Sequence, residues 1–267
     1  MRRPWPGVAS VAVLVALTGL FYRGLVFDGL ILGDYDAFVY FYPLRHYAAE
    51  QLRQGHFPLW NPYLFLGSPF FANIQTAVLY PANLVYLLLD TPHAYSASVA
   101  GHVLLAGASM YMFSRRTLVL SRLPSLLAAI TFMFSGFMTA QVGHVNQLNV
   151  AAWLPLLLVA FDEAVRRRSL CLGVGAGAVG ALQLLAGHAQ EWYFSSATLG
   201  LFALWRVVVP TGAAPAVVKA RPGVQRLRPL AYLMLAGLVE AGLAAVQVIP
   251  TLELSGESIR GGGMAYR

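Results

Sequence analysis

The chain has 267 residues, of which 58% are hydrophobic and 11% are charged. This composition excludes an ordinary soluble domain and predicts a polytopic membrane protein, because several stretches approach the roughly 20 apolar residues that cross a bilayer. The net charge of +7 would suggest nucleic acid as a partner of a soluble chain, but the basic residues cluster between apolar segments, so we expect no nucleic-acid partner. The single cysteine, Cys171, excludes a disulfide framework.

Apolar segments predict an all-α polytopic transmembrane bundle of about seven spans. They lie at 7–27, 94–113, 123–140, 148–161, 170–186, 192–209 and 230–249. No small-residue cleavage site follows the first segment, so we interpret it as an uncleaved span and not as a secretory signal. The basic clusters fall between alternate pairs of spans, which predicts a multi-pass protein of the cell membrane with a cytoplasmic N-terminus.

These spans divide the chain into four parts. We expect a cytoplasmic N-terminus and first span at 1–27, an external loop at 28–92, spans two to seven within 93–250 and an external C-terminal segment at 251–267. The loop is long, and its many aromatic residues argue against disorder, so we expect it to fold at the membrane surface. Pro43 and Gly55 predict one short interfacial helix between them, and a second surface helix is expected from Asn73 to Leu89.

Two features within the expected spans concern packing. Gly173, Gly177 and Gly180 recur at spacings that let neighbouring backbones approach closely. Glu240 is the one acid placed near the middle of a span. An intramembrane acid indicates either a functional group or a carboxyl that ties two helices together.

The loop opens with the stretch GDYDAFVYFYP, in which Asp34 and Asp36 stand two positions apart. Such a pair is typical of a turn and helix cap, because Asp accepts local backbone N–H bonds. It also suits chemistry, since a positioned carboxylate can accept the proton of an attacking hydroxyl. Two turns, GHVNQLN and GHAQEW, can bring further polar side chains to the same face or can simply cap helices. They contribute His144, Asn146, Gln147, His188, Gln190 and Glu191.

Five stretches carry a resemblance to a known family: GDYDAFVYFYP, GHFPLWNP, LGSPFFANIQTAVLYPANL, GHVNQLNVAAWLPLLL and GHAQEWYF. Together they resemble the bacterial YfhO family of membrane proteins, which are similar to the GT-C class of integral-membrane glycosyltransferases. The resemblance covers essentially the whole chain. Family members are considerably longer, so the chain looks like the N-terminal half of such a protein or a truncated product.

The resemblance implies a reaction outside the cytoplasm. A sugar would pass from a polyprenyl-phosphate donor in the membrane to an acceptor in a cell-envelope glycan or polymer. Asp34 matches the position of the family's catalytic carboxylate and would act as the base or organise the donor phosphate through a metal, with Asp36 as a helper. Any divalent cation, Mg or Mn, would be held by these two aspartates, because the sequence has no H-E-x-x-H or C-x-x-C pattern.

A phosphate leaving group also needs cationic or hydrogen-bond-donating partners. The candidate substrate-binding residues are Arg45, His46, His56, Trp60, Asn61, Gln75, His144, Gln147, His188, Gln190 and Glu191. Aromatic residues of the same segment would also suit the headgroup zone of a membrane without any ligand.

Two other classes of function remain open. A membrane transporter or flippase component should place its acids near the middle of the membrane, where only Glu240 and His102 are expected. A catalytically silent membrane subunit would bind neither the polyprenyl-phosphate donor nor the sugar acceptor.

Overall fold

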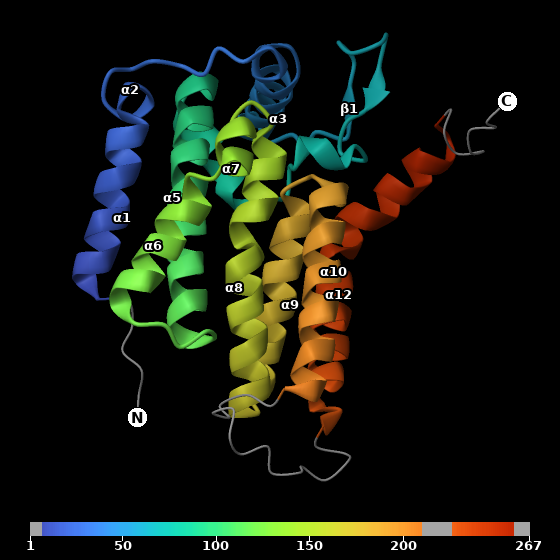
Figure 1. Ribbon diagram of the computed structural model, residues 1–267. Coiled ribbons are helices and arrows are strands. Elements are labelled where there is room, and N and C mark those ends of the chain that lie inside the picture. The colour runs from blue at the N-terminus through green and yellow to red at the C-terminus, as the bar shows by residue number, and fades with distance from the viewer. Residues whose placement is uncertain (1–6, 210–225, 259–267) are drawn as a thin grey trace, which may run out of the picture.

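Long helices run alternately up and down through the molecule, and residues 28–90 lie across one end of them (Figure 1). The computed structural model describes residues 7–209 and 226–258. The principal helices are α1 (Val8–Phe21), α5 (Thr91–Arg116), α6 (Arg122–Met133), α8 (Val145–Arg167), α9 (Leu170–Leu185), α10 (Ala189–Val208) and α12 (Arg228–Gly256). Helices α5 and α8 form the centre of the bundle, and Val99, Val103 and Leu148 are fully buried between the elements.

Each apolar segment expected from the sequence coincides largely with one or more helices. In the described part of the chain, four helical segments are long and apolar enough to cross a membrane: Thr91–Arg116, Arg122–Ala140, Val145–Arg167 and Arg228–Gly256. Helices α1 and α9 are apolar but shorter. These findings indicate a helical membrane protein, while the count of seven crossings stays a prediction.

The expected third span is interrupted. Helix α6 ends at Met133, and the short helix α7 (Gly136–Ala140) begins after Ser135, whose hydroxyl accepts a hydrogen bond from the backbone N–H of Met138 at 3.4 Å. A serine that satisfies one of the first N–H groups favours a new helix start at this point.

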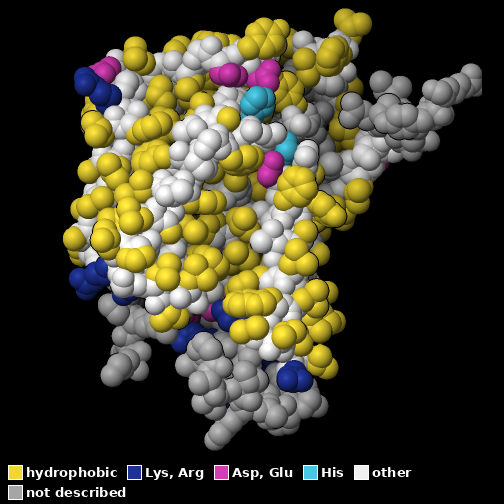
Figure 2. Space-filling view, viewed as in Figure 1, with side chains coloured by type: hydrophobic (Ala, Val, Ile, Leu, Met, Phe, Trp, Pro, Cys, Tyr) yellow, Lys and Arg dark blue, Asp and Glu magenta, His cyan; other side chains and the backbone are white. Residues whose placement is uncertain are grey.

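The two ends of the bundle differ in charge. We call the end that carries residues 28–90 the loop end and the opposite one the basic end. Figure 2 shows most acidic and His side chains toward the loop end and most Lys and Arg side chains toward the basic end. Two acids missed by the sequence reasoning lie at the basic end: Asp162 pairs with Arg206 at 2.7 Å in a buried ion pair, and Glu163 pairs with Arg166 and Arg167.

The small residues of α9 pack as expected. A Cβ on Gly173 would meet Tyr232 of α12 at 2.9 Å, and one on Gly177 would meet the carbonyl oxygen of Ala236 at 2.5 Å. At Gly177 the obstacle is backbone, so glycine is required there for α9 and α12 to approach as closely as they do, whereas at Gly173 a Cβ would displace side chains of α12.

Residues 28–90 form short elements. The π-helical turn η1 (Ala37–Phe41) continues into helix α3 (Tyr42–Arg53), which confirms the helix expected between Pro43 and Gly55. Strands β1 (Trp60–Asn61) and β2 (Ser68–Pro69) pair antiparallel in the register Trp60↔Pro69. The apolar face of α3 packs against this hairpin through Leu44, Ala48 and Phe70.

The prediction of a second surface helix from Asn73 to Leu89 is wrong. The segment forms two 3₁₀ turns, η2 (Ile74–Thr76) and η3 (Pro81–Leu84), followed by the single-turn helix α4 (Val85–Leu88). Ala77 adopts the left-handed conformation with φ +46°, and Tyr80 is extended immediately before Pro81. Both features end helical winding, because a residue before proline disfavours the α-helical region.

A buried chain of hydrogen bonds fixes this segment to the bundle. The Trp153 indole of α8 donates to the Tyr80 hydroxyl at 2.7 Å, and this hydroxyl lies 2.6 Å from Nε2 of His102 in α5. Nδ1 of His102 lies 2.7 Å from the Ser98 carbonyl oxygen. The carbonyl can only accept, so Nδ1–H donates to it and Nε2 accepts from the hydroxyl of Tyr80.

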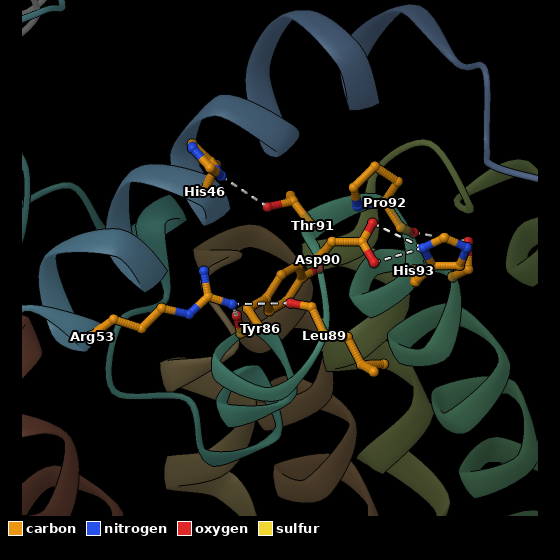
Figure 3. A network of polar contacts seen from close by, with 9 residues as sticks. His46, Arg53, Tyr86, Leu89, Asp90, Thr91, Pro92 and His93 are labelled. Atoms are coloured by element: carbon orange, nitrogen blue, oxygen red, sulfur yellow. Dashed lines mark hydrogen bonds and ion pairs between the residues drawn. The ribbon is translucent and has the colours of Figure 1, made fainter.

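Helix α3 is held by a second polar network (Figure 3). The Arg53 guanidinium donates to the carbonyl oxygens of Tyr86 in α4, at 2.9 Å, and of Leu89 just after α4, at 3.2 Å. Nδ1 of His46 lies 3.3 Å from the Thr91 hydroxyl at the start of α5. These contacts join the surface helix to the first membrane helix that follows the loop.

Helix α12 continues beyond the expected boundary at residue 250 and runs beside the loop. Gln247 donates to the Phe71 carbonyl oxygen at 2.9 Å, and Thr251 donates to that of Ala72 at 2.8 Å. The loop is thus tied to helices from both halves of the chain.

Candidate functional site

Asp34 caps the helix that follows it. Its Oδ1 accepts a hydrogen bond from the backbone N–H of Asp36 at 3.0 Å, and its own carbonyl oxygen accepts from Phe38 N–H at 3.1 Å. The capping interpretation of GDYD is therefore confirmed. The Asp34 carboxylate stays exposed at the surface, so capping leaves it accessible to a ligand.

The same carboxylate lies against the first of the two GH turns. A Cβ on Gly143 would meet the Asp34 carboxyl carbon at 2.3 Å, so any larger residue would displace the acid from this position. The turn itself is held by Tyr95 of α5, whose hydroxyl lies 3.0 Å from the carbonyl oxygens of both Val142 and Gly143. This close approach brings GDYD next to the start of α8.

Asp36 and His144 form the closest ionisable pair of the site. Nε2 of His144 lies 2.7 Å from Oδ2 of Asp36, and both side chains are partly exposed. The carboxylate can only accept, so Nε2 carries a hydrogen. Nδ1 of His144 is buried and has no hydrogen-bond partner among the described residues.

The second GH turn meets the first through Gln147 and His188. Nδ1 of His188 accepts from the backbone N–H of Glu191 at 3.3 Å and caps α10. Nε2 therefore carries the hydrogen of the neutral ring, and it lies 3.0 Å from Nε2 of Gln147. Both nitrogens would donate, so this tautomer requires the Gln147 amide to be turned over so that its oxygen accepts from the ring. Burial lowers the pKa of His188, and the nearby His144 lowers it further, so His188 is held neutral.

These contacts build one polar cluster at the loop end, made of Asp34, Asp36, His144, Gln147 and His188. Its members come from the loop, the first turn of α8 and the turn before α10. Figure 2 shows acidic and His side chains near one another on this face. The cluster offers carboxylates, imidazoles and an amide within one surface region, which suits a ligand with several hydroxyl groups.

Arg45 does not join the cluster. Its guanidinium is buried and donates to the carbonyl oxygens of Gln75, at 3.3 Å, and Thr76, and to the Asn146 side chain. The Asn146 amide in turn donates to the carbonyl oxygens of Gln75 at 2.9 Å and Gly187 at 3.1 Å. We call this arrangement the Arg45–Asn146 clamp. It ties α3, η2, α8 and the turn before α10 together, which leaves Arg45 unable to reach a ligand.

The remaining candidates lie elsewhere on the loop or make no side-chain contact with the cluster. His46 contacts Thr91, and Trp60 and Asn61 belong to strand β1, where Oδ1 of Asn61 accepts from Tyr63 N–H at 2.9 Å.

Four candidates make no side-chain hydrogen bond within the described residues. His56 and Gln190 are exposed. Gln75 contributes its carbonyl oxygen to the Arg45–Asn146 clamp, and Glu191 contributes its backbone N–H to His188.

The cluster does not fit a resident metal ion. Among the described residues, no group of three or more His, Cys, Asp or Glu side chains is arranged to hold one. Asp34 is turned to its own helix cap and Gly143, while Asp36 is turned to His144. We therefore derive no step through the expected Mg or Mn ion.

Comparison with known proteins does not identify a family for this chain. Neither family models, nor curated proteins, nor solved structures match the chain.

Proposed function

We propose that the protein is a GT-C-like membrane glycosyltransferase that moves a sugar from a polyprenyl-phosphate donor to a cell-envelope acceptor outside the cytoplasm. The observation that carries the proposal is the packing of Asp34 on Gly143, which brings the GDYD acids to the first GH turn, and this turn contacts the second through Gln147 and His188. Sequence stretches that resemble one family are thereby neighbours in space. The expected sidedness, with the loop end outside, is part of the proposal.

Asp34 is the proposed base. One of its oxygens holds the Asp36 N–H, while its carboxylate remains exposed. In an inverting transfer, the acceptor hydroxyl gives its proton to a carboxylate as its oxygen bonds to the anomeric carbon. The bond from that carbon to the phosphate oxygen breaks, and its electron pair leaves with the phosphate.

His144 is the proposed partner of the leaving phosphate. Asp36 orients its ring through the 2.7 Å contact between Oδ2 and Nε2, which holds the imidazole at the loop end beside the proposed base. His188 is held neutral and hydrogen-bonded to Gln147, so these two residues act by positioning hydroxyl groups of the sugar.

The test is sugar transfer by membranes that carry the chain. Labelled sugars on a panel of polyprenyl phosphates are supplied to wild type, Asp34→Asn and Asp28→Asn at equal expression. Asparagine retains the capping oxygen, so Asp34→Asn removes the base without removing the helix cap. Asp28 is a matched control, because it lies in the same loop and pairs only with Arg23 in the described structure.

We expect transfer that Asp34→Asn abolishes and Asp28→Asn preserves. Transfer that survives Asp34→Asn would remove this residue from the mechanism. If no donor supports transfer by the wild type, a transporter or a silent subunit becomes the better proposal.

A further inference from the structure

An apolar groove runs between α10 and α12 and reaches the loop end. Its volume is about 610 Å³, and its walls include Leu199 of α10 and Leu233 and Ala245 of α12. Large apolar side chains on its α12 side, such as Ile249 and Leu252, are 65% exposed. In a membrane protein such exposed apolar groups face lipid, so the groove opens to the bilayer.

Glu240 places a carboxylate in this groove. The Trp192 indole donates to its Oε1, and a Cβ on Gly180 would meet its Oε2 at 2.3 Å, so the glycine makes room for the acid. Oε2 has no hydrogen-bond partner among the described residues. Trp192 lies in the first turn of α10, which places Glu240 near the loop end of the neighbouring helices rather than midway along them.

The charge of the groove restricts what can enter it. Within the described part of the chain, the lining contains Glu240 and no Lys, Arg or His. An anionic headgroup would meet a carboxylate without any cation to offset it, which is unfavourable in a low-dielectric setting. A headgroup that donates hydrogen bonds would instead satisfy Oε2.

We propose that the groove binds a single-chain amphiphile whose polar end donates hydrogen bonds and carries no negative charge. The headgroup contacts Oε2 of Glu240, and the hydrocarbon chain lies along Leu199 and Leu233. Leu233 is seven residues from Glu240 along α12, or about 10 Å toward the basic end. The hydrocarbon chain of the amphiphile therefore runs from Glu240 into the apolar interior of the bilayer. This site does not depend on the proposed sugar transfer, whose donor carries a phosphate.

The test is photo-crosslinking of the full chain in maltoside detergent. Three probes share a hexadecyl chain with a diazirine and differ in the headgroup, which is a primary amine, an alcohol or a phosphate. Crosslinked peptides are located by mass spectrometry, and exposed α6 residues such as Leu127 report unspecific contact.

Three variants sharpen the result. Glu240→Gln keeps an acceptor for the Trp192 indole and removes the charge. Glu253→Gln is the matched control, because it alters an exposed acid of the same helix outside the groove. Ala241→Phe fills the groove from one wall, and gel filtration verifies that each variant remains folded.

We expect the amine and the alcohol to label α10 and α12 well above α6. Glu240→Gln should lower amine labelling about tenfold, as expected for loss of a charge-assisted hydrogen bond, and Ala241→Phe should block all labelling of the groove. Equal labelling by the phosphate, or equal labelling of α6, would overturn the proposal and leave only bulk lipid contact. Unchanged amine labelling in Glu240→Gln would also overturn it.

Discussion

A single substitution in the buried Arg45–Asn146 clamp should destabilise the fold. Replacing Asn146 by leucine keeps the approximate side-chain volume, so little cavity forms. It removes two hydrogen bonds: the one that the Asn146 amide donates to the Gly187 carbonyl oxygen, and the one that Arg45 donates to the Asn146 amide oxygen. Asn146 is 1% exposed, so water cannot replace either partner.

The expected cost follows from these two unsatisfied groups. A buried donor or acceptor without a partner costs about 1 to 3 kcal/mol, and somewhat more when one group is charged. The Gln75 carbonyl oxygen retains its contact with Arg45 and adds no further cost. We therefore expect Asn146→Leu to lower the free energy of unfolding by about 4 kcal/mol.

Unfolding by dodecyl sulfate in maltoside micelles, followed by tryptophan fluorescence, measures this change. Gln54→Leu makes the same replacement of an amide by an alkyl group at an exposed site, where the one side-chain bond runs to Glu50 at 2.8 Å. It should alter the free energy of unfolding by less than about 0.5 kcal/mol. A loss below about 1 kcal/mol for Asn146→Leu would refute the role that we assign to the clamp.

Three further outcomes are expected. His188→Asn retains a capping oxygen. Because the pKa of His188 is lower in the folded chain than in the unfolded chain, the unfolded chain binds this proton first, so the wild type loses free energy of unfolding below about pH 6.5 and the variant should lose less. Unfolding at pH 7.5 and 5.5 measures the difference, and an unchanged pH dependence would contradict it. Gly143→Ala should displace Asp34 and lower sugar transfer about a hundredfold, and normal transfer rates would exclude this steric reasoning. In a background without the native cysteine, Leu66→Cys should react with an impermeant thiol reagent in intact cells and Arg168→Cys should not, whereas the reverse pattern would place the loop end in the cytoplasm.

Much of the helical framework could be predicted because long apolar segments in a membrane protein favour helices, which satisfy their own backbone hydrogen bonds. The expected helix between Pro43 and Gly55 is present for a local reason, since proline starts a helix and glycine ends it. The helix expected from Asn73 failed for two reasons: Pro81 interrupts it, which the sequence shows, and Ala77 turns left-handed, which local spacing does not reveal. That conformation depends on contacts with residues far along the chain.

The candidate site was predictable in part. The acids of GDYD and the two GH turns have recognisable sequence patterns, and the structure brings their side chains together. Arg45 carries the same sequence signal as a ligand-binding arginine, and only its tertiary partners reveal that it is structural. The steric role of Gly143 and the depth of Glu240 likewise depend on packing between helices, which no local pattern encodes.

The Arg45–Asn146 clamp also sets an order of assembly. Its two side chains are separated by 101 positions, and the contact of Gln247 with Phe71 spans 176. At roughly 5 to 20 residues per second, the ribosome adds the intervening residues of the clamp over about 5 to 20 s. Throughout that interval a segment rich in tyrosine and phenylalanine waits without its final partners. Docking of the loop is therefore a late event in biogenesis, and cells that make this protein must shield the segment until α8 and the turn before α10 are in place.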